Sequence, residues 1–201
     1  MRVSSSRSRK NKFRTFVFFK PYGVISQFTP DGGHQPISDF CPFPDDVYPV
    51  GRLDWDSEGL LLLTNDNVLK HRYTDPRFEH PRTYFVQVEG VPLMSALQRL
   101  RTGIVIEGKK TKPATVHLLK VEPRLPPRPV PIRYRKNIPT AWLEMTITEG
   151  RNRQVRKMTA AVGHPTLRIV RVKIGTISLG SLKPGERRVL MRDADDDVHL
   201  P

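Results

Sequence analysis

The sequence predicts an α+β domain built around a mixed, largely antiparallel β-sheet. Segments with the β-branched and aromatic composition of strands outnumber segments with the apolar periodicity of helices. The helical segments do not alternate regularly with the strands, as they do in parallel α/β folds. A chain of 201 residues with 37% hydrophobic residues can bury one substantial core. We therefore expect a single folded domain.

The N-terminal segment differs from the rest of the chain in composition. Residues 1–14 contain six Lys or Arg, four Ser and no acid. They can bury too little apolar surface to offset the entropy lost on ordering, so we predict a flexible basic tail. The folded domain then covers 15–201 and begins with a strand over 15–19 and a turn over 21–23.

The next part of the domain is predicted to contain a loop, a short helix and three strands. Residues 29–46 are rich in Pro, Gly and Asp, which favours a loop. Asn65 or Asp66 can cap a helix that ends near residue 73. The strands are expected over 47–50, 59–63 and 84–88.

Two further helices carry apolar residues at helical spacing. The first covers 92–102, with Pro92 in its first turn and Gly103 as its C-terminal cap. The second covers 152–162. Between them, residues 123–139 contain six prolines and five basic residues, which predicts a long ordered loop. Additional strands are expected over 140–148, 165–174 and 187–191.

The charge balance indicates the class of partner. Thirty-four Lys and Arg oppose 20 Asp and Glu, and the net charge of +14 favours binding to nucleic acid. A membrane protein would show a basic amphipathic helix or a long apolar segment, but the longest aliphatic run is 60–63. The N-terminus also lacks the apolar core of a signal peptide, so we expect a cytoplasmic protein. Cys41, the only cysteine, has no partner for a disulfide or a structural zinc site.

The segment GRLDWDSEGLLLLTND, residues 51–66, places three acids directly before a very apolar strand. If the backbone is extended there, Asp54, Asp56 and Glu58 share one face and could bind a divalent cation, as in a metal-dependent nuclease. A turn would break that shared face, and the sequence shows no obvious second cluster of acidic or histidine ligands. From composition alone, a solvated acidic loop is the alternative.

The same segment resembles the signature of the RsuA-type family of ribosomal RNA pseudouridine synthases, in which the Asp of G-R-L-D is catalytic. That position is Asp54 here. The resemblance continues in order through KPYGVISQF at 20–28, RTYFVQVEG at 82–90 and EGRNRQVRKMTAAVGHPTLRI at 149–169. In addition, PIRYRKNIPTAWL at 131–143 is similar to the E-type subgroup, which acts on large-subunit (23S) rRNA and lacks the S4 RNA-binding domain.

The resemblance implies a pseudouridine synthase fold with a central RNA-binding cleft that isomerises a specific uridine in 23S rRNA. The reaction breaks the N1–C1′ bond and joins C5 to C1′, with the target base flipped into the site. An ionised carboxylate can attack or stabilise C1′, or assist removal of a sugar proton, without a metal or redox cofactor. We therefore expect no cofactor and no metal. The expected partner is rRNA or a large-subunit assembly intermediate, and the expected enzyme is a monomer.

The resemblance also assigns Tyr84 and Arg156 to the site of Asp54. Tyr84 occupies the position of an aromatic residue that packs on the target base, whereas strand alternation alone favours a buried structural tyrosine. Arg156 occupies the position of an arginine that offsets desolvation of the carboxylate, and its alternative role is a phosphate contact. We expect these three side chains to meet in one cleft.

Four more arginines are expected to bind RNA. Arg52 resembles an arginine that enters the space near the displaced nucleotide, although a phosphate contact is the simpler interpretation. Arg82 stands where many relatives have Lys, which preserves the charge but not the ammonium geometry. Arg151 and Arg153 are expected to be general RNA contacts. The alternative function is a noncatalytic RNA-binding or ribosome-assembly protein on the same fold, which charge alone does not distinguish from the enzyme.

Overall fold

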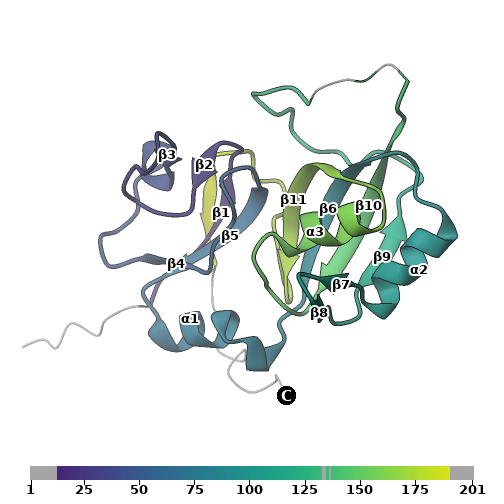
Figure 1. The fold of residues 1–201 in the computed structure, drawn as a ribbon. Helices are drawn as coiled ribbons and strands as arrows, with labels where there is room; N and C mark the ends of the chain where they lie inside the picture. Colours follow the sequence, from purple (N-terminus) through teal and green to yellow (C-terminus); the bar gives the residue numbers. More distant parts are fainter. Residues whose placement is uncertain (1–12, 133–134, 136, 191–201) are drawn as a thin grey trace, which may run out of the picture.

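The computed structural model describes residues 13–132, 135 and 137–190. Within them, a mixed nine-stranded sheet forms the centre of the molecule (Figure 1). Its strands are β1 (Thr15–Lys20), β4 (Tyr48–Val50), β5 (Glu58–Thr64), β6 (Arg82–Glu89), β9 (Thr115–Leu118), β10 (Thr140–Ile147), β11 (Thr166–Ile174), β12 (Ile177–Ser178) and β13 (Arg187–Val189). They follow the order β13-β1-β5-β11-β6-β10-β9, with β4 beside β5 and β12 beside β11.

Helices and two small sheets complete the described part of the fold (Figure 1). The helices are α1 (Asn67–Thr74), α2 (Met94–Thr102), α3 (Gln154–Ala161) and the 3-10 helices η1 (Ile37–Asp39) and η2 (Pro76–Phe78). The small sheets pair β2 (Val24–Ile25) with β3 (Gln35–Pro36), and β7 (Val105–Ile106) with β8 (Lys109–Lys110). Helix α2 packs beside β9, and α3 contacts β11. None of the helices in the described residues is long and apolar enough to cross a membrane.

The predicted α+β fold with a mixed, largely antiparallel sheet is confirmed. Within the described part of the nine-stranded sheet, only β5 and β11 pair in parallel. The predicted loop over 29–46 is wrong in part, because it contains β3 and η1. Helix α2 begins two residues later than predicted, and α3 begins after Arg153, whose left-handed φ of 49° is incompatible with the helix. Residues 1–12 of the predicted tail, and Met191 of the last predicted strand, lie outside the described residues.

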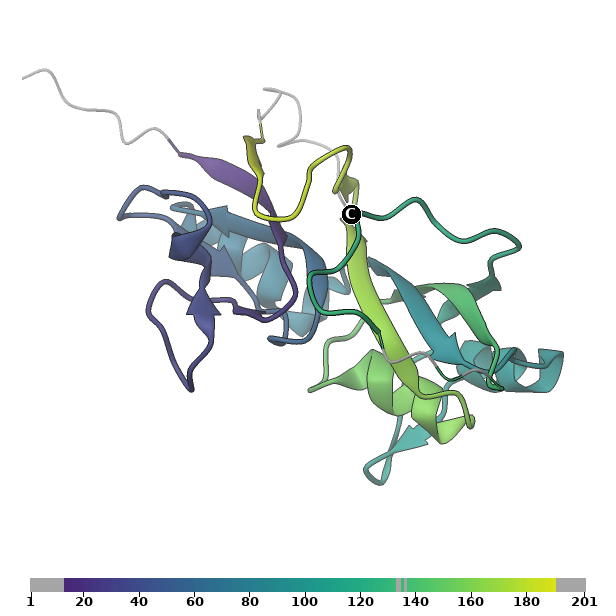
Figure 2. The same cartoon turned by 90° about the horizontal axis from the view of Figure 1, so that it is seen from above.

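The sheet consists of two halves that meet at a short contact. One half contains β1, β4, β5 and β13, and the other contains β6, β9, β10, β11 and β12. In the described residues, the strand pairing that joins them consists of two residue pairs, Val170 with Glu58 and Arg171 with Gly59. Seen from above, the halves diverge from this contact (Figure 2). The divergence leaves room for a cavity between them.

Glycine is required at the contact between the two halves. Gly59 has a φ of 104°, and a Cβ atom there would lie 2.3 Å from the carbonyl oxygen of Arg171. Any side chain would therefore push β5 away from β11. Beyond Gly59, the side chains of Leu60 to Leu63 are fully buried, because both faces of β5 are covered.

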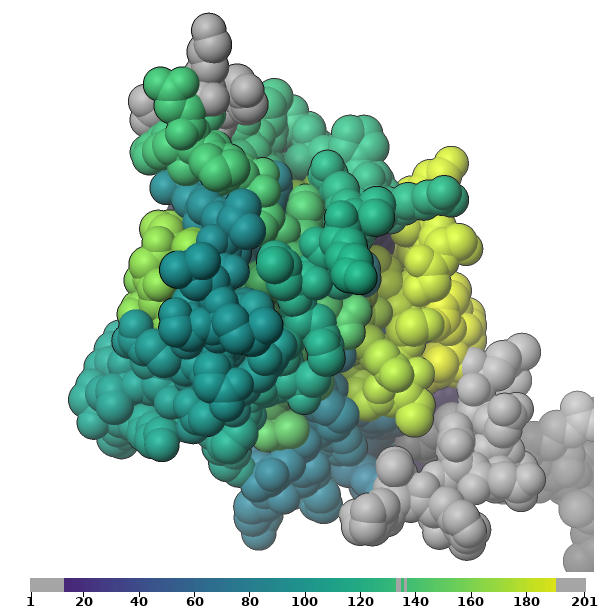
Figure 3. Space-filling model, turned by 90° about the vertical axis from the view of Figure 1, so that its right-hand side faces the viewer, coloured from purple at the N-terminus to yellow at the C-terminus, as the bar shows by residue number. Residues whose placement is uncertain are grey.

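The proline-rich segment between β9 and β10 has no helix or strand in its described residues, in agreement with the predicted loop. It extends beyond the end of the sheet (Figures 1 and 3). The loop is attached to the core where Arg168 Nη2 donates to the carbonyl oxygen of Pro126 at 2.8 Å. Its base is therefore fixed although it lacks regular secondary structure.

A buried ion pair lies beside the contact between the halves. Arg168 Nε and Nη2 each donate to Glu58, and both N···O distances are 2.8 Å. The side chains are only 8% and 2% exposed, respectively. Such a pair offsets its desolvation only when both partners are present. Glu58 is therefore a structural residue of the core and does not belong to a solvated acidic loop.

We predict that Arg168→Met lowers the free energy of unfolding by about 3–5 kcal/mol, because it leaves the Glu58 carboxylate buried without a counter-charge. The double variant Glu58→Leu/Arg168→Met should recover most of this loss, since no charge then remains buried. Urea unfolding would measure both effects. Arg77→Met, which removes the exposed guanidinium of Arg77 from Asp75, is the control and should change stability little. A double variant as unstable as Arg168→Met would contradict the explanation.

Lys20, at the end of β1, is fully buried, and its ammonium donates to the carbonyl oxygens of Pro21 and Val24. Burial lowers the pKa of Lys20 to about 7, against the opposing attraction of Glu58, Asp56 and Asp54. Between this value and the ordinary pKa of 10.5, the unfolded chain holds a proton that the folded protein lacks. Folding stability contributed by this residue therefore rises with pH across that range.

We predict that the free energy of unfolding of the wild type rises, relative to that of Lys20→Met, between about pH 7 and about pH 10. Urea unfolding of both proteins across this range is the measurement. The difference should be constant below about pH 7, where the lysine is protonated in both states. A difference that does not change with pH would show that Lys20 stays charged in the folded protein.

Candidate active site

The cavity between the two halves of the sheet has a volume of about 420 Å³. Its walls come from the segment before β5, from β6 and β11, and from residues 150–156 at the start of α3. All seven arginine, aspartate and tyrosine residues predicted as site residues line it: Arg52, Asp54, Arg82, Tyr84, Arg151, Arg153 and Arg156. The expected meeting of Asp54, Tyr84 and Arg156 in one cleft is thus observed.

The backbone around Asp54 is held by hydrogen bonds to Ser26 and within its own turn. Ser26 Oγ accepts from Leu53 N and donates to Leu53 O, both at 2.9 Å. The carbonyl oxygen of Asp54 accepts from Ser57 N at 3.0 Å, which closes a turn. Asp54 is therefore presented from a fixed turn, and its side chain stays 37% exposed at the cavity.

This turn separates the three acids that an extended backbone would have placed on one face. Asp54 faces the cavity, Asp56 pairs with arginines, and Glu58 enters the core beside Arg168. The shared carboxylate face considered from the sequence does not form. The described residues contain no group of three His, Cys, Asp or Glu side chains that could hold a metal ion.

Asp56 organises the arginines next to Asp54. Arg153 donates to both of its carboxylate oxygens at 3.0 and 2.7 Å. Arg156 Nη2 donates to the backbone oxygen of Asp56 at 2.7 Å and lies 3.4 Å from its carboxylate. Arg153 also lies 3.6 Å from the Asp54 carboxylate. Among the described residues, Asp54 thus forms its ion pair with Arg153, which was expected only as a general RNA contact.

These contacts shift the titration of the charged groups. Burial raises the pKa of Asp56, but the hydrogen bond from Arg153 and the charge of Arg156 outweigh it, so that the pKa is lowered. The hydrogen bond to Asp56 raises the pKa of Arg153. Burial lowers the pKa of Arg156, opposed mainly by Asp56. Near neutral pH Asp56 is thus an ionised acceptor between the charged guanidinium groups of Arg153 and Arg156.

Tyr84 and Arg171 form the deeper wall of the cavity. Tyr84 is 8% exposed and lies on the strand adjacent to Arg171. Arg171 Nε donates to Leu60 O at 2.7 Å, whereas its buried Nη2 has no hydrogen-bond partner among the described residues. Burial lowers the pKa of Arg171, and the nearby Tyr84 opposes this shift. A buried donor without a partner is unfavourable unless a ligand supplies the acceptor.

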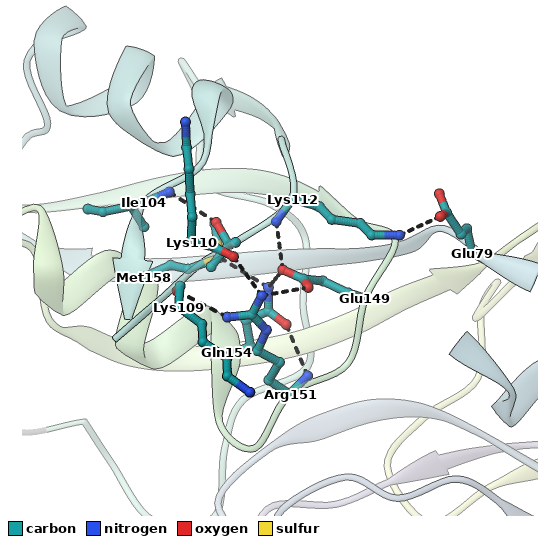
Figure 4. A network of polar contacts seen from close by, with 10 residues as sticks. Glu79, Ile104, Lys109, Lys110, Lys112, Glu149, Arg151, Gln154 and Met158 are labelled. Carbon is teal, nitrogen blue, oxygen red and sulfur yellow. Dashed lines mark hydrogen bonds and ion pairs between the residues drawn. The ribbon is translucent and has the colours of Figure 1, made fainter. Parts of the chain in front are cut away.

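Arg82 and Arg151 line the cavity but also hold neighbouring backbone. Arg82 Nη2 donates to Tyr73 O at 3.1 Å. Arg151 donates to the carbonyl oxygens of Lys109 and Lys110, which form β8 (Figure 4). It also lies 3.2 Å from the carboxylate of Glu149. The guanidinium of Arg151 thus has three partners within the protein. A contact of Arg151 with RNA stays a prediction.

The network in Figure 4 fixes the start of α3, where Arg153 and Arg156 lie. Gln154 Oε1 accepts from Arg151 N at 3.0 Å, and Gln154 Nε2 donates to Glu149 at 2.6 Å. These bonds support the left-handed conformation of Arg153, which is unfavourable for a residue other than glycine. The network therefore helps to direct Arg153 towards the two aspartates.

Sequence reasoning missed several residues of the site. The roles of Ser26 and Arg171 depend on contacts across the fold, and neither stands in a spacing typical of catalysis. The basic residues interleaved in the strand 165–174 could have indicated a role for Arg171, because an arginine inside a buried strand requires specific partners. Asp56 was noticed but was considered only as a metal ligand or part of a solvated loop.

The arrangement can bind a polyanion and hold an ionised carboxylate at a half-enclosed cavity. Six arginines around one exposed acid favour phosphate groups. The volume of about 420 Å³ lies in the range of about 300–1,000 Å³ typical of small-molecule pockets. The Tyr84 ring provides a flat wall for an aromatic ligand.

Comparisons with known proteins agree with this chemistry. The model of the family described as RNA pseudouridylate synthase matches residues 14–161. The ribosomal large subunit pseudouridine synthase E of Xanthomonas campestris pv. campestris is 58% identical over 172 residues, which cover 85% of this chain and 91% of that protein. The protein of the same name from Vibrio vulnificus is 46% identical over 189 residues, covering 92% and 80%.

Solved structures give the same result. A crystal structure of a pseudouridylate synthase matches with a TM-score of 0.74 and 30% identity, covering 90% of this chain and 71% of that one. A protein from an H/ACA RNP bound to a substrate RNA matches with a TM-score of 0.53 and 14% identity, which concerns the fold alone. Together with the family match over most of the chain, the cavity and its residues show that this chain belongs to the RNA pseudouridylate synthase family.

Proposed function

We propose that this protein isomerises a specific uridine of 23S ribosomal RNA to pseudouridine, with Asp54 as the essential carboxylate. The main support is the position of Asp54 on a fixed turn, exposed to a cavity that arginines and Tyr84 surround. The names of the relatives, ribosomal large subunit pseudouridine synthase E, support the rRNA and the subunit. A cytoplasmic location and a monomeric enzyme stay predictions from the sequence.

The reaction is an isomerisation, because uridine and pseudouridine contain the same atoms and differ in the bond that joins the base to the sugar. The N1–C1′ bond breaks, the uracil turns within the cavity, C5 bonds to C1′, and the proton lost from C5 is balanced by one gained at N1. Asp54 acts at the sugar, by attack on C1′, by stabilising its positive charge, or by taking a sugar proton. Each of these routes requires an ionised carboxylate.

The surrounding residues would keep Asp54 ionised while bound RNA excludes water. Arg153 supplies the ion pair at 3.6 Å, and Arg156 lies beyond Asp56 as a second positive charge. Tyr84 would pack against the flipped uracil, and the unpartnered Nη2 of Arg171 would donate to an acceptor of the bound nucleotide. Arg52 and Arg82 would bind the flanking phosphates.

We predict that Asp54→Asn abolishes pseudouridine formation but leaves RNA affinity nearly unchanged, because it removes the charge and preserves the size of the side chain. The measurement is mapping of pseudouridine in rRNA, with and without each protein, together with an RNA binding curve. Substantial residual turnover would overturn the assignment of Asp54. Wild-type protein that binds rRNA without modifying it would instead favour the noncatalytic alternative.

We predict that Asp56→Asn slows pseudouridine formation by about tenfold to a hundredfold, because it loosens the arginines that position Asp54. The single-turnover rate at saturating RNA is the measurement. Asp46→Asn, which breaks the exposed pair with Arg14, removes the same charge elsewhere and serves as the control. A loss equal to that of Asp54→Asn would instead indicate that both carboxylates take part in the chemistry.

A further inference from the structure

An aromatic cluster lies on the surface beside the candidate active site. The imidazole of His34 stacks on the indole of Trp55, with ring centroids 4.8 Å apart and planes 19° apart. Tyr22 contacts Trp55 at 5.7 Å, and the guanidinium of Arg128 lies 4.0 Å above the ring of Tyr22. We call these four residues, from four loops of the chain, the aromatic platform.

The platform is joined to the cavity through the turn that carries Asp54, although none of its four residues lines the cavity itself. Trp55 directly follows Asp54 in the same turn, and its carbonyl oxygen accepts from Gly23 N at 2.8 Å. Tyr22 is close enough to influence the pKa of Arg156, which burial lowers. The Trp55 ring is therefore carried by the same short turn as Asp54.

Trp55 is exposed although its position is fixed. It remains 41% exposed, whereas Trp142, the other tryptophan of the chain, is 6% exposed in β10. Contacts with His34 and Tyr22 restrict the indole before any ligand binds. A large, pre-ordered aromatic surface loses little conformational entropy on binding, which favours recognition.

The surroundings of the platform favour a nucleic acid over an apolar partner. Arg128 on the platform and Arg52 and Arg153 at the cavity supply positive charge around the aromatic rings. Stacking on aromatic side chains, combined with a basic surface for the phosphates, is how proteins bind single-stranded RNA. Duplex bases present no free face to such a surface, so the ligand must contain an unpaired base.

We propose that Trp55, supported by His34 and Tyr22, stacks on an unpaired nucleobase of the RNA next to the target uridine. This binding site rests on the proposed function for the identity of its RNA. The stacked base would fix the neighbouring nucleotide outside the cavity while the target uridine enters it. A competing explanation is that the cluster only stiffens the turn that carries Asp54.

The chain permits a direct optical test. In the variant Trp142→Phe, Trp55 is the only tryptophan, and its emission reports on the platform alone. We would titrate this protein with oligouridylate and with an abasic oligomer that has the same number of phosphates. The emission should change on binding oligouridylate and not on binding the abasic oligomer. A purely stiffening role would leave the emission equally unaffected by both ligands and would overturn the proposal.

Binding measurements on platform variants add a second readout. Trp55→Leu should weaken oligouridylate binding by about tenfold without affecting the abasic oligomer, and Trp55→Phe should restore most of the affinity. Phe78→Leu changes an exposed aromatic residue on η2, 45% exposed, and should have no effect. Equal losses of affinity for both oligomers with Trp55→Leu would contradict stacking. If ribosomal proteins alone, and no RNA, change the emission, the platform binds protein and the proposal is wrong.

Failure of this inference can be distinguished from failure of the proposed function. Pseudouridine formation by the wild type and its loss in Asp54→Asn test the function. If wild-type protein forms pseudouridine but the emission of Trp55 does not change on binding oligouridylate, only the nucleobase site on the platform is rejected. If the emission responds but no pseudouridine forms in any rRNA, the function is rejected and the nucleobase site stands.

Discussion

The close contact between the backbones of β5 and β11 determines where the site lies. The two strands share two residue pairs, and Gly59 leaves no space for a Cβ atom against Arg171. Because the halves of the sheet diverge beyond this contact, their separation produces a cavity and not a continuous core. The buried pair of Glu58 and Arg168 strengthens the same joint through side chains. A rigid joint keeps Asp54 and Tyr84, which come from opposite halves, at a constant separation, as a positioned reaction requires.

The charges at the cavity are distributed unequally between the two neighbouring aspartates. Asp56 receives the short hydrogen bonds from Arg153, at 2.7 and 3.0 Å, whereas Asp54 has a contact of 3.6 Å with the same guanidinium. Asp56 therefore holds the arginine in place, and its lowered pKa keeps it ionised in this role. Asp54 benefits from the nearby positive charge without having its oxygens occupied by two short bonds. It is the carboxylate with more freedom to meet a substrate.

The fold class was predictable from strand composition, which is a local signal, and the resemblance of four ordered motifs to a known family predicted seven residues of the cavity but not Arg171. The hydrogen-bond and ion-pair partners of the cavity residues could not be predicted from the sequence. Asp56 and Arg153 are 97 residues apart, and their pairing depends on how the two halves of the sheet meet. The left-handed Arg153 likewise lies between Arg151 and Gln154, whose hydrogen bonds with each other and with Glu149 form only in the folded chain. Alternation of the acids suggested a shared face, but the turn after Asp54 required hydrogen bonds that only the folded chain supplies.

That turn explains how chemistry and recognition can be combined in so few residues. Three successive side chains leave it in different directions: Asp54 towards the cavity, Trp55 onto His34, and Asp56 towards Arg153. Each neighbour fixes the backbone that the others share, because Ser26 anchors Leu53 and Gly23 binds the carbonyl oxygen of Trp55. Hydrogen bonds on both sides of Asp54 therefore keep the carboxylate and the Trp55 ring at fixed places on one short segment, so that a base held by Trp55 and a sugar at Asp54 would share one support.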